Sequence, residues 1–439
     1  MTQLSPNKAV QNQLAQETLS AQGSTKNVIL AGVVGNVIEW YDFALYGYLA
    51  PVISLLFFPN NNELVSLIET YGVFAAGFIM RPIGAGIFGY IGDRVSRRTE
   101  LFISVILMAI PTFMLGLLPT YKQIGIAAPI ILILLRLVQG LSVGGEFTGS
   151  VTYVAETAPQ TRRGFATSFV NVGSTVGLLL GLGIVTLITH LLSDANMYAW
   201  GWRIPFLLGG ILGVTGLYIR SGLPDSEVFE QHQQERQVPL LGALQKSLVP
   251  MLQAMVYAGG YTSVYYIAMV YIPTYLDRFT GISRTSVLII NVVALALQML
   301  LLPLFGWLSD STLRRKSWLL LTAISLVPIG LATFWLLLQP NPYGVWLAQI
   351  GLAIALVPLL ASSPVMMVEL FPTETRLTAY SLSFNLGASI MGGTSLLVCT
   401  WLINITDKLY APAFYLAGCA ILGAIATGFM RDRSREPLL

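Results

Sequence analysis

Long apolar runs recur in the sequence from Val28 almost to its end, and the short polar segments between them hold nearly all of the charge. A helix that spans a membrane needs about 20 predominantly apolar residues. Of the 439 residues, 55% are hydrophobic and only 10% are charged, whereas about a quarter of an average soluble domain is charged. The sequence therefore predicts an all-α membrane protein with no room for a sizeable soluble domain.

Twelve transmembrane helices are predicted from these runs. Their bounds are 28–57, 65–91, 101–119, 126–155, 165–191, 201–219, 249–276, 285–308, 318–338, 343–368, 377–404 and 411–430. An even number places both termini on one side of the membrane. If that side is cytoplasmic, the outer loops hold only Lys122, Arg203, Arg278, Arg284 and Lys408 among the basic residues. Because cytoplasmic loops are enriched in Lys and Arg, both termini are expected inside the cell.

The longest connection between predicted spans divides the chain into two halves. We expect a disordered cytoplasmic tail over 1–27, a first six-helix half over 28–219, a cytoplasmic linker over 220–248, a second six-helix half over 249–430 and a short cytoplasmic tail over 431–439. The first tail is rich in Gln, Asn and Ser and lacks an apolar core, which is typical of disorder and not of a signal peptide.

The two halves repeat each other in their loops. The segment GYIGDRVSRR (89–98) resembles GWLSDSTLRRK (306–316), because both have Gly, three residues, Asp and then a basic pair. A second loop repeats as well: Glu156, Pro159 and Arg163 recur at the same spacing as Glu369, Pro372 and Arg376. Corresponding loops on the same side of the membrane indicate parallel repeats, as in one large class of secondary transporters.

Four motifs carry a resemblance to a known family. They are GNVIEWYDFALYG (35–47), FAAGFIMRPIGAGIFGYIGDR (74–94), RLVQGLSVGGEFTGS (136–150) and WGWRIPF (200–206). With these motifs the chain resembles the major facilitator superfamily, and within it the metabolite:proton symporter family of proline/betaine, α-ketoglutarate, citrate and shikimate permeases. Residues 124–165 and 194–220 look nearest to proline/betaine members, whereas 74–84 looks equally like an α-ketoglutarate permease. The resemblance implies the major facilitator fold and proton-coupled transport.

Five charged residues stand inside predicted spans, namely Glu39, Asp42, Arg81, Arg136 and Glu146. Each costs about 2.5 to 3.5 kcal/mol at the centre of a spanning helix, so these groups should pair or face water. Their spacing places Glu39, Asp42 and Arg81 at a shared depth with Glu146 nearby. We expect a central cluster in which one acid carries a proton and Arg81 binds a substrate carboxylate. Arg136 is a second anion clamp or a helix brace, and the alternative for all five is salt bridges that only pack helices.

The predicted seventh span carries tyrosines at four-residue spacing, Tyr257, Tyr261 and Tyr265. Such a stripe packs helices or forms an aromatic wall for a cationic nitrogen. Asn385, in an Asn-x-Gly pattern of the eleventh span, is a candidate for a neutral hydrogen bond to substrate or for a contact between helices.

Charged loop residues between the second and third spans and between the eighth and ninth are candidates for gating. They are Asp93, Arg94, Arg97, Arg98, Asp310, Arg314 and Arg315. An Asp at a helix N-terminus and an Arg across the boundary between the halves would stabilise the outward-facing state. The family resemblance assigns this role to the Asp93 loop. Ser96 and Ser311 depart from the usual form of the two loop motifs.

Enzymatic functions are not supported by the motifs. The only histidines are His190 and His232, and the sequence has no HExxH motif, no metal-ligand spacing of Cys and His and no phosphate-binding GxxxxGK[ST] loop. No cofactor or metal is expected, and a net charge of +3 gives no reason to expect nucleic-acid binding. The leading hypothesis is a monomeric inner-membrane symporter of protons and a small polar osmolyte such as proline or betaine. A di- or tricarboxylate such as α-ketoglutarate or citrate is the alternative substrate, and a non-transporting membrane sensor is the alternative of another class.

Overall fold

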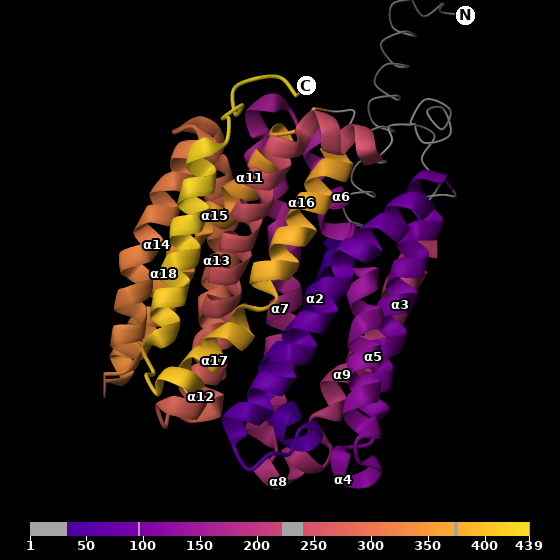
Figure 1. The fold of residues 1–439 in the computed structure, drawn as a ribbon, viewed down its shortest axis with the longest axis vertical. Helices are drawn as coiled ribbons and strands as arrows, with labels where there is room; N and C mark the ends of the chain where they lie inside the picture. Colours follow the sequence, from indigo (N-terminus) through magenta and orange to yellow (C-terminus); the bar gives the residue numbers. More distant parts are fainter. Residues whose placement is uncertain (1–32, 95–96, 222–239, 340, 373–375, 439) are drawn as a thin grey trace, which may run out of the picture.

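The computed structural model describes residues 33–94, 97–221, 240–339, 341–372 and 376–438. Side chains are described throughout these ranges except at 89–101, 153, 157, 219–221, 240–246 and 342. Within them the chain forms α-helices, short turns of other helix types and no strands. The long helices run side by side along one direction and form a single bundle (Figure 1).

The helices begin and end as follows. They are a first helix Val33–Phe57, α2 (Glu63–Arg94), α3 (Arg97–Leu117), α4 (Tyr121–Ile124), α5 (Ala127–Ser142), α6 (Glu146–Thr157), α7 (Arg163–Leu191), α8 (Asp194–Asn196), α9 (Arg203–Ser221), α11 (Leu240–Tyr266), α12 (Ile272–Phe279), α13 (Arg284–Ser311), α14 (Arg315–Leu337), α15 (Pro342–Glu369), α16 (Arg376–Gly387), α17 (Ser395–Thr406) and α18 (Ala411–Phe429).

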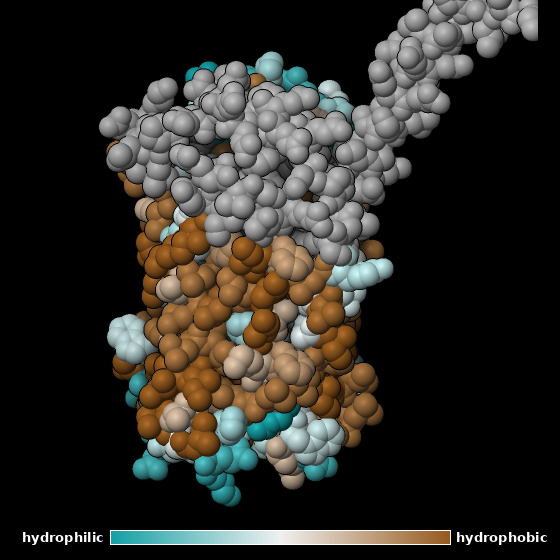
Figure 2. Space-filling model, turned by 90° about the vertical axis from the view of Figure 1, so that its right-hand side faces the viewer, coloured by the Kyte–Doolittle hydropathy of each residue, from teal (hydrophilic) through white to brown (hydrophobic). Residues whose placement is uncertain are grey.

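Among the described residues, nine helical segments are long and apolar enough to cross a membrane, and Phe102–Leu117 and Arg203–Tyr218 are shorter apolar helices. On the face that Figure 2 shows, apolar residues cover the middle of the bundle and hydrophilic residues gather at its lower end. The chain is thus a multi-pass helical membrane protein. Twelve spans and cytoplasmic termini stay predictions, as does the division at 220–248, where residues 222–239 lie outside the described part of the chain.

Three of the predicted spans are interrupted. The span predicted at 126–155 breaks between α5 and α6 at Val143–Gly145, where two glycines favour a bend. The span predicted at 249–276 is divided by a wide π-type turn at Ile267–Tyr271, and the one predicted at 377–404 by another at Ala388–Gly392. Turns of this type inside helices are frequent at functional sites, and all three breaks adjoin the interior described below.

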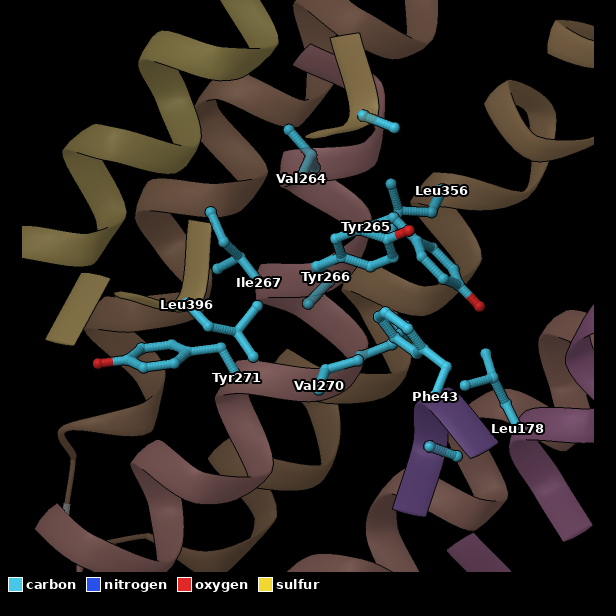
Figure 3. Packing of buried hydrophobic residues seen from close by; sticks show 14 of the residues in the cluster. Phe43, Leu178, Val264, Tyr265, Tyr266, Ile267, Val270, Tyr271, Leu356 and Leu396 are labelled. Atoms are coloured by element: carbon cyan, nitrogen blue, oxygen red, sulfur yellow. The ribbon is translucent and has the colours of Figure 1, made fainter. Parts of the chain in front are cut away.

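The helices of 33–221 meet those of 240–429 along a boundary that we call the seam. Across it α7 packs against α13 and α15, α2 against α17, and α6 against α16. In Figure 3 the side chain of Phe43, from the first helix, reaches Val270 and the Tyr265–Tyr266 pair of the second half. The Phe43 and Tyr266 rings are 4.9 Å apart. The aromatic core therefore joins the two halves at mid-depth.

The seam has two ends, the C-terminal side and the opposite side. At the C-terminal side lies the end of the chain, and at the opposite side lie α4, α8 and α12 (Figure 1). The candidate site is in the middle of the seam, between these two ends.

Candidate functional site

Close contact between α2 and α5 positions the intramembrane arginines. A Cβ atom on Gly140 would stand 1.9 Å from the carbonyl oxygen of Gly77, and one on Gly84 would stand 1.9 Å from that of Leu141. Only glycine permits backbones to approach so closely, which is how small residues pack membrane helices. The contact holds Arg81 of α2 and Arg136 of α5 beside the first helix.

Arg81 pairs with Glu39 inside the bundle. The Nη2 atom of Arg81 is 2.9 Å from Oε1 of Glu39, and both side chains are buried. The guanidinium of Arg81 also lies over the ring of Phe78, 4.4 Å from its centroid. The charge of each partner is thus balanced locally, as buried charges require.

Asp42 belongs to a second, separate network. Its Oδ2 accepts from Nη1 of Arg136 at 3.0 Å, and its Oδ1 accepts from Nε2 of Gln139 at 2.8 Å and from the hydroxyl of Thr112 at 2.7 Å. Arg136 also donates to Oε1 of Gln139 at 2.8 Å and lies over the ring of Tyr46 at 4.5 Å. All of these groups are buried.

The central cluster expected from the sequence is therefore divided into two ion pairs. Residues three apart on a helix point about 60° apart, and this angle is enough to direct Glu39 to α2 and Asp42 to α5 and α3. Glu146 lies in the first turn of α6, where the helix dipole favours a negative charge. Glu39 and Asp42 thus pair with different arginines, where one shared guanidinium was expected from the sequence.

Two small adjoining cavities lie in the seam. The first is lined mainly by aromatic and hydroxyl side chains, from the first helix, α6, α7, α11, α15 and α16. The second is lined by Glu39, Arg81 and Asn385 among others. Trp40, Phe147 and Phe384 line both, so the two spaces form one site with an aromatic end and a charged end.

Neither cavity has room for a metabolite in this conformation. The space open to the centre of a water molecule is about 20 Å³ in the first cavity and about 10 Å³ in the second. That volume holds one or two waters. Seam contacts lie on both sides of the cavities, as described below, so the structure is a closed state from which either side would have to open.

The predicted tyrosines and Asn385 divide between the cavity and its surroundings. Tyr261 and Tyr265 line the first cavity, together with Tyr266. Tyr257 lines neither; it hydrogen-bonds Ser363 and stacks on Tyr261 with centroids 6.2 Å apart. Asn385 lines the second cavity and donates to the Gly144 carbonyl oxygen at 2.6 Å, an acceptor that the helix break leaves free.

Three aromatic residues of the site were missed by sequence reasoning. Trp40, Phe147 and Phe384 line both cavities, and the rings of Phe147 and Phe384 stack across the seam at 5.3 Å. A signal was present in two cases, because Trp40 and Phe147 directly follow the intramembrane acids Glu39 and Glu146. Phe384 has no such neighbour.

The C-terminal side of the seam is closed by Asp310, one of the predicted gating residues. Its Oδ1 and Oδ2 accept from the backbone N–H groups of Gly164 at 2.9 Å and of Phe165 at 2.8 Å. The last turn of α13 in one half thus caps the first turn of α7 in the other. Arg315, also predicted, is buried 2.5 Å from Asp310 and 2.6 Å from Glu369.

Two further ion pairs cross the seam here, formed by residues that were not among the predicted gating residues. Arg376 is 2.5 Å from Glu156, and Arg163 is 3.8 Å from Glu369. These four residues are the repeated loop positions noted above, and each acid pairs with the base of the other repeat. The repetition itself was the signal that could have identified them.

The remaining predicted gating residues are placed as follows. Arg314 is exposed and precedes α14. The side chains of Asp93, Arg94, Arg97 and Arg98 lie outside what the structure describes, so their gating role stays a prediction.

The C-terminal segment 430–438 crosses the same end of the seam. From the first half, Gln160 donates to the carbonyl oxygen of Arg435 at 3.2 Å and Arg163 to that of Glu436 at 3.4 Å. From the second half, Arg315 donates to the carbonyl oxygen of Ser434 at 3.0 Å. The segment is therefore held by both halves.

Contacts also close the opposite side. Arg278 of α12 pairs with Glu63 at the start of α2. The Tyr48 hydroxyl, from the first helix, donates to the carbonyl oxygen of Met269 at 2.8 Å and accepts from Asn291 at 3.0 Å. The site is thus sealed at both ends.

Comparison with known proteins agrees with the helical bundle. The Major Facilitator Superfamily model matches residues 33–396. The glycine betaine/proline/ectoine/pipecolic acid transporter OusA of Dickeya dadantii is 35% identical, over 96% of this chain and 86% of its own length. The proline/betaine transporter of Escherichia coli strain K12 is 34% identical, over 97% of this chain and 87% of its own length.

Solved structures show the same fold. The xylose transporter XylE from E. coli, in a partially occluded inward-open conformation, superposes with a TM-score of 0.75 at 17% sequence identity, over 95% of this chain and all of that one (100%). The proton:xylose symporter XylE bound to 6-bromo-6-deoxy-D-glucose gives a TM-score of 0.74 at 16% identity, over 94% of this chain and 97% of that one. These findings confirm the resemblance stated from the sequence motifs. The chain belongs to the major facilitator superfamily of membrane transporters, and its relatives of about one-third identity are transporters named for proline and betaine.

Proposed function

We propose that this protein is a symporter that carries a proton together with a small zwitterionic osmolyte, such as proline or glycine betaine, across the bacterial inner membrane. The names of its relatives support the substrate class, and a proton:xylose symporter has the same fold. The observation that carries the proposal is the seam cavity, in which the single guanidinium of Arg81 stands beside a wall of aromatic rings.

The two ends of this cavity match the two ends of a zwitterion. Arg81 would bind the carboxylate, in place of its present partner Glu39, because a guanidinium and a carboxylate form charge-assisted hydrogen bonds. Trp40, Tyr261 and Tyr265 would face the nitrogen, since aromatic faces attract ammonium and quaternary ammonium groups. Asn385, at the charged end, would add a neutral hydrogen bond.

The dicarboxylate alternative requires two anion clamps in the cavity. Arg136, the expected second clamp, lines neither cavity and is bound to Asp42 and Gln139. A second carboxylate would therefore find no free guanidinium among the described lining residues. This arrangement favours one substrate carboxylate and not two.

We assign the transported proton to Asp42. The Asp42 network is buried and lies apart from the cavity lining, so a substrate carboxylate need not displace its partners. Glu39 has a different role in this proposal: it occupies Arg81 until substrate arrives, and then its own charge favours the substrate nitrogen. Glu146, which is also buried and lines neither cavity, is the alternative carrier of the proton.

Transport would proceed by alternating opening of the two sides of the seam, as in transporters with repeated halves. We place the C-terminal side in the cytoplasm, following the distribution of Lys and Arg between loops. The contacts of Asp310 and Glu156 would break when that side opens, and those of Tyr48 and Arg278 when the opposite side opens.

Uptake by purified protein in liposomes tests this function. With an inward proton gradient imposed, radiolabelled proline or glycine betaine should accumulate, and α-ketoglutarate should not compete. Arg81→Gln should eliminate uptake, whereas Arg136→Gln should act through the Asp42 network and uncouple it from the gradient. Accumulation of α-ketoglutarate with equal damage from both substitutions would refute the zwitterion assignment. Absence of any uptake, with the protein correctly folded, would favour the sensor alternative.

A further inference from the structure

The hydroxyl group of Thr112 lies within hydrogen-bond distance of two acceptors but has only one proton to donate. Its Oγ1 lies 2.7 Å from Oδ1 of Asp42, 2.7 Å from the carbonyl oxygen of Met108 and 2.9 Å from Nε2 of Gln139. The Met108 carbonyl can only accept, and the Gln139 amide nitrogen can only donate. The single hydroxyl proton of Thr112 therefore serves either Met108 or Asp42, and never both at once.

Each of these two choices suits one charge state of Asp42. When Asp42 is ionised, the Thr112 hydroxyl can turn to the carboxylate and donate to Oδ1. When Asp42 holds a proton on Oδ1, that proton is donated to Thr112, and the hydroxyl proton goes to the Met108 carbonyl instead. The oxygen that takes the proton is Oδ1, because Oδ2 faces the cation of Arg136. No heavy atom has to move between the two states.

The other groups around Asp42 cannot make this change. The charged or titratable side chains that face it, among the described residues, are Arg136 from α5 and, on its own helix, Tyr41 and the nearby Glu39. Arg136 only donates, Tyr41 donates to the Pro205 carbonyl oxygen at 2.7 Å, and Glu39 is held by Arg81. The described side chains of α3 include no charged group.

We infer that Thr112 is a positioning residue for proton coupling, whose hydroxyl gives Oδ1 of the buried Asp42 a hydrogen-bond partner both when the carboxyl group holds a proton and when it is ionised. This inference rests on the proposed function, because it takes Asp42 to be the proton carrier. Thr112 itself touches neither substrate nor cavity. Its contribution is to make both charge states of one acid compatible with one packing.

The test compares Thr112→Val with Thr112→Ser, in liposomes with radiolabelled glycine betaine and proline as probes. Valine keeps the shape of threonine and removes the hydroxyl, whereas serine keeps the hydroxyl and removes the methyl group. A hydrogen bond to a charged group is worth more than one to a neutral group, so Thr112→Val should weaken the ionised state more. The pH midpoint of gradient-driven uptake should rise by about one unit in Thr112→Val, and Thr112→Ser should restore the wild-type midpoint.

One further measurement and one further variant keep the outcomes distinct. Substrate exchange at equal pH needs no net proton movement, so at a pH low enough to protonate Asp42 in every variant it should continue in both Thr112→Ser and Thr112→Val. If Thr112→Val does not accumulate in the membrane, Thr112→Ala asks the same question with a smaller side chain. A wild-type midpoint in the variant that lacks the hydroxyl, or an equal shift in Thr112→Ser, would overturn the inference.

Asp42→Asn, measured in parallel, separates this inference from the proposed function. If Asp42→Asn abolishes gradient-driven uptake but retains exchange, the proposed carrier stands, and the Thr112 variants alone decide the inference. If Asp42→Asn still accumulates substrate against a gradient, the assignment of the proton to Asp42 fails and the inference about Thr112 fails with it.

Discussion

Replacing Asp310 with Asn should make the C-terminal side open more often without unfolding the bundle. The Asp310 carboxylate accepts from the backbone N–H groups of Gly164 and Phe165, at 2.9 Å and 2.8 Å. A hydrogen bond to a charged group contributes about 1.5 to 3 kcal/mol and a neutral one about 0.5 to 1.5 kcal/mol. In Asn only one of the two side-chain atoms is an acceptor, so one bond becomes a neutral one and the other is lost. The closed state should therefore lose about 3 to 4 kcal/mol. The fold should survive, because Arg315 keeps Glu369 as a partner at 2.6 Å.

A loss of that size changes the ratio of open to closed molecules about 140- to 700-fold, since 1.4 kcal/mol is a factor of about ten. The assay is the labelling rate of a cysteine introduced at Thr148, which lines the second cavity. Cys399 and Cys419, both free and buried, are replaced by serine. An impermeant maleimide is then added on the C-terminal side.

The matched control for this experiment is Ser311→Ala. Ser311 follows Asp310 directly, is exposed, and donates to the Trp307 carbonyl oxygen of its own helix. Labelling at Thr148→Cys should accelerate in Asp310→Asn and stay at the wild-type rate in Ser311→Ala. Equal rates in the two variants would refute the conclusion that Asp310 holds the seam closed.

Two other predictions concern the same end of the seam. Gly164→Val should lower uptake at least tenfold at normal expression, because a Cβ atom there would lie 2.4 Å from Oγ of Ser309. The control is Gly183→Val on the same helix, where a Cβ atom would have no atom within 4 Å and uptake should stay near the wild-type rate. Equal loss in both variants would point to a general effect on α7. Glu156→Arg should likewise lower uptake, because it places a second cation beside Arg376. Adding Arg376→Glu should restore uptake in part. A double variant no better than the single one would contradict the pairing across the seam.

Much of the fold could be predicted from the sequence, because lipid imposes a length and a composition on every spanning helix. The repeated loops indicated the arrangement of the halves for a similar reason, since corresponding segments occupy corresponding places. The break at Gly144 was not predicted, because an apolar run with two glycines is equally compatible with a continuous helix. The hydrogen bond from Asn385 to the Gly144 carbonyl oxygen, which depends on this break, could therefore not be predicted.

The partners inside the bundle depended on information that the sequence does not hold. Depth along a helix follows from residue number, so Glu39, Asp42 and Arg81 were placed at similar levels. Rotation about the helix axis is set by packing, here by the close glycine contacts of α2 and α5, and it decided which acid meets which arginine. The aromatic residue Phe384 was missed because its place in the site is defined entirely by the opposing ring of Phe147.

The reciprocal pairs at the C-terminal side also bear on how such a chain can originate. Glu156 of the first repeat meets Arg376 of the second, and Glu369 of the second meets Arg163 of the first. In a two-fold symmetric dimer of identical subunits, residue i contacts residue j of the partner and j contacts i. One glutamate and one arginine in an ancestral six-helix subunit would have produced both pairs at once. The pattern is the one that gene duplication and fusion of such a homodimer would leave behind.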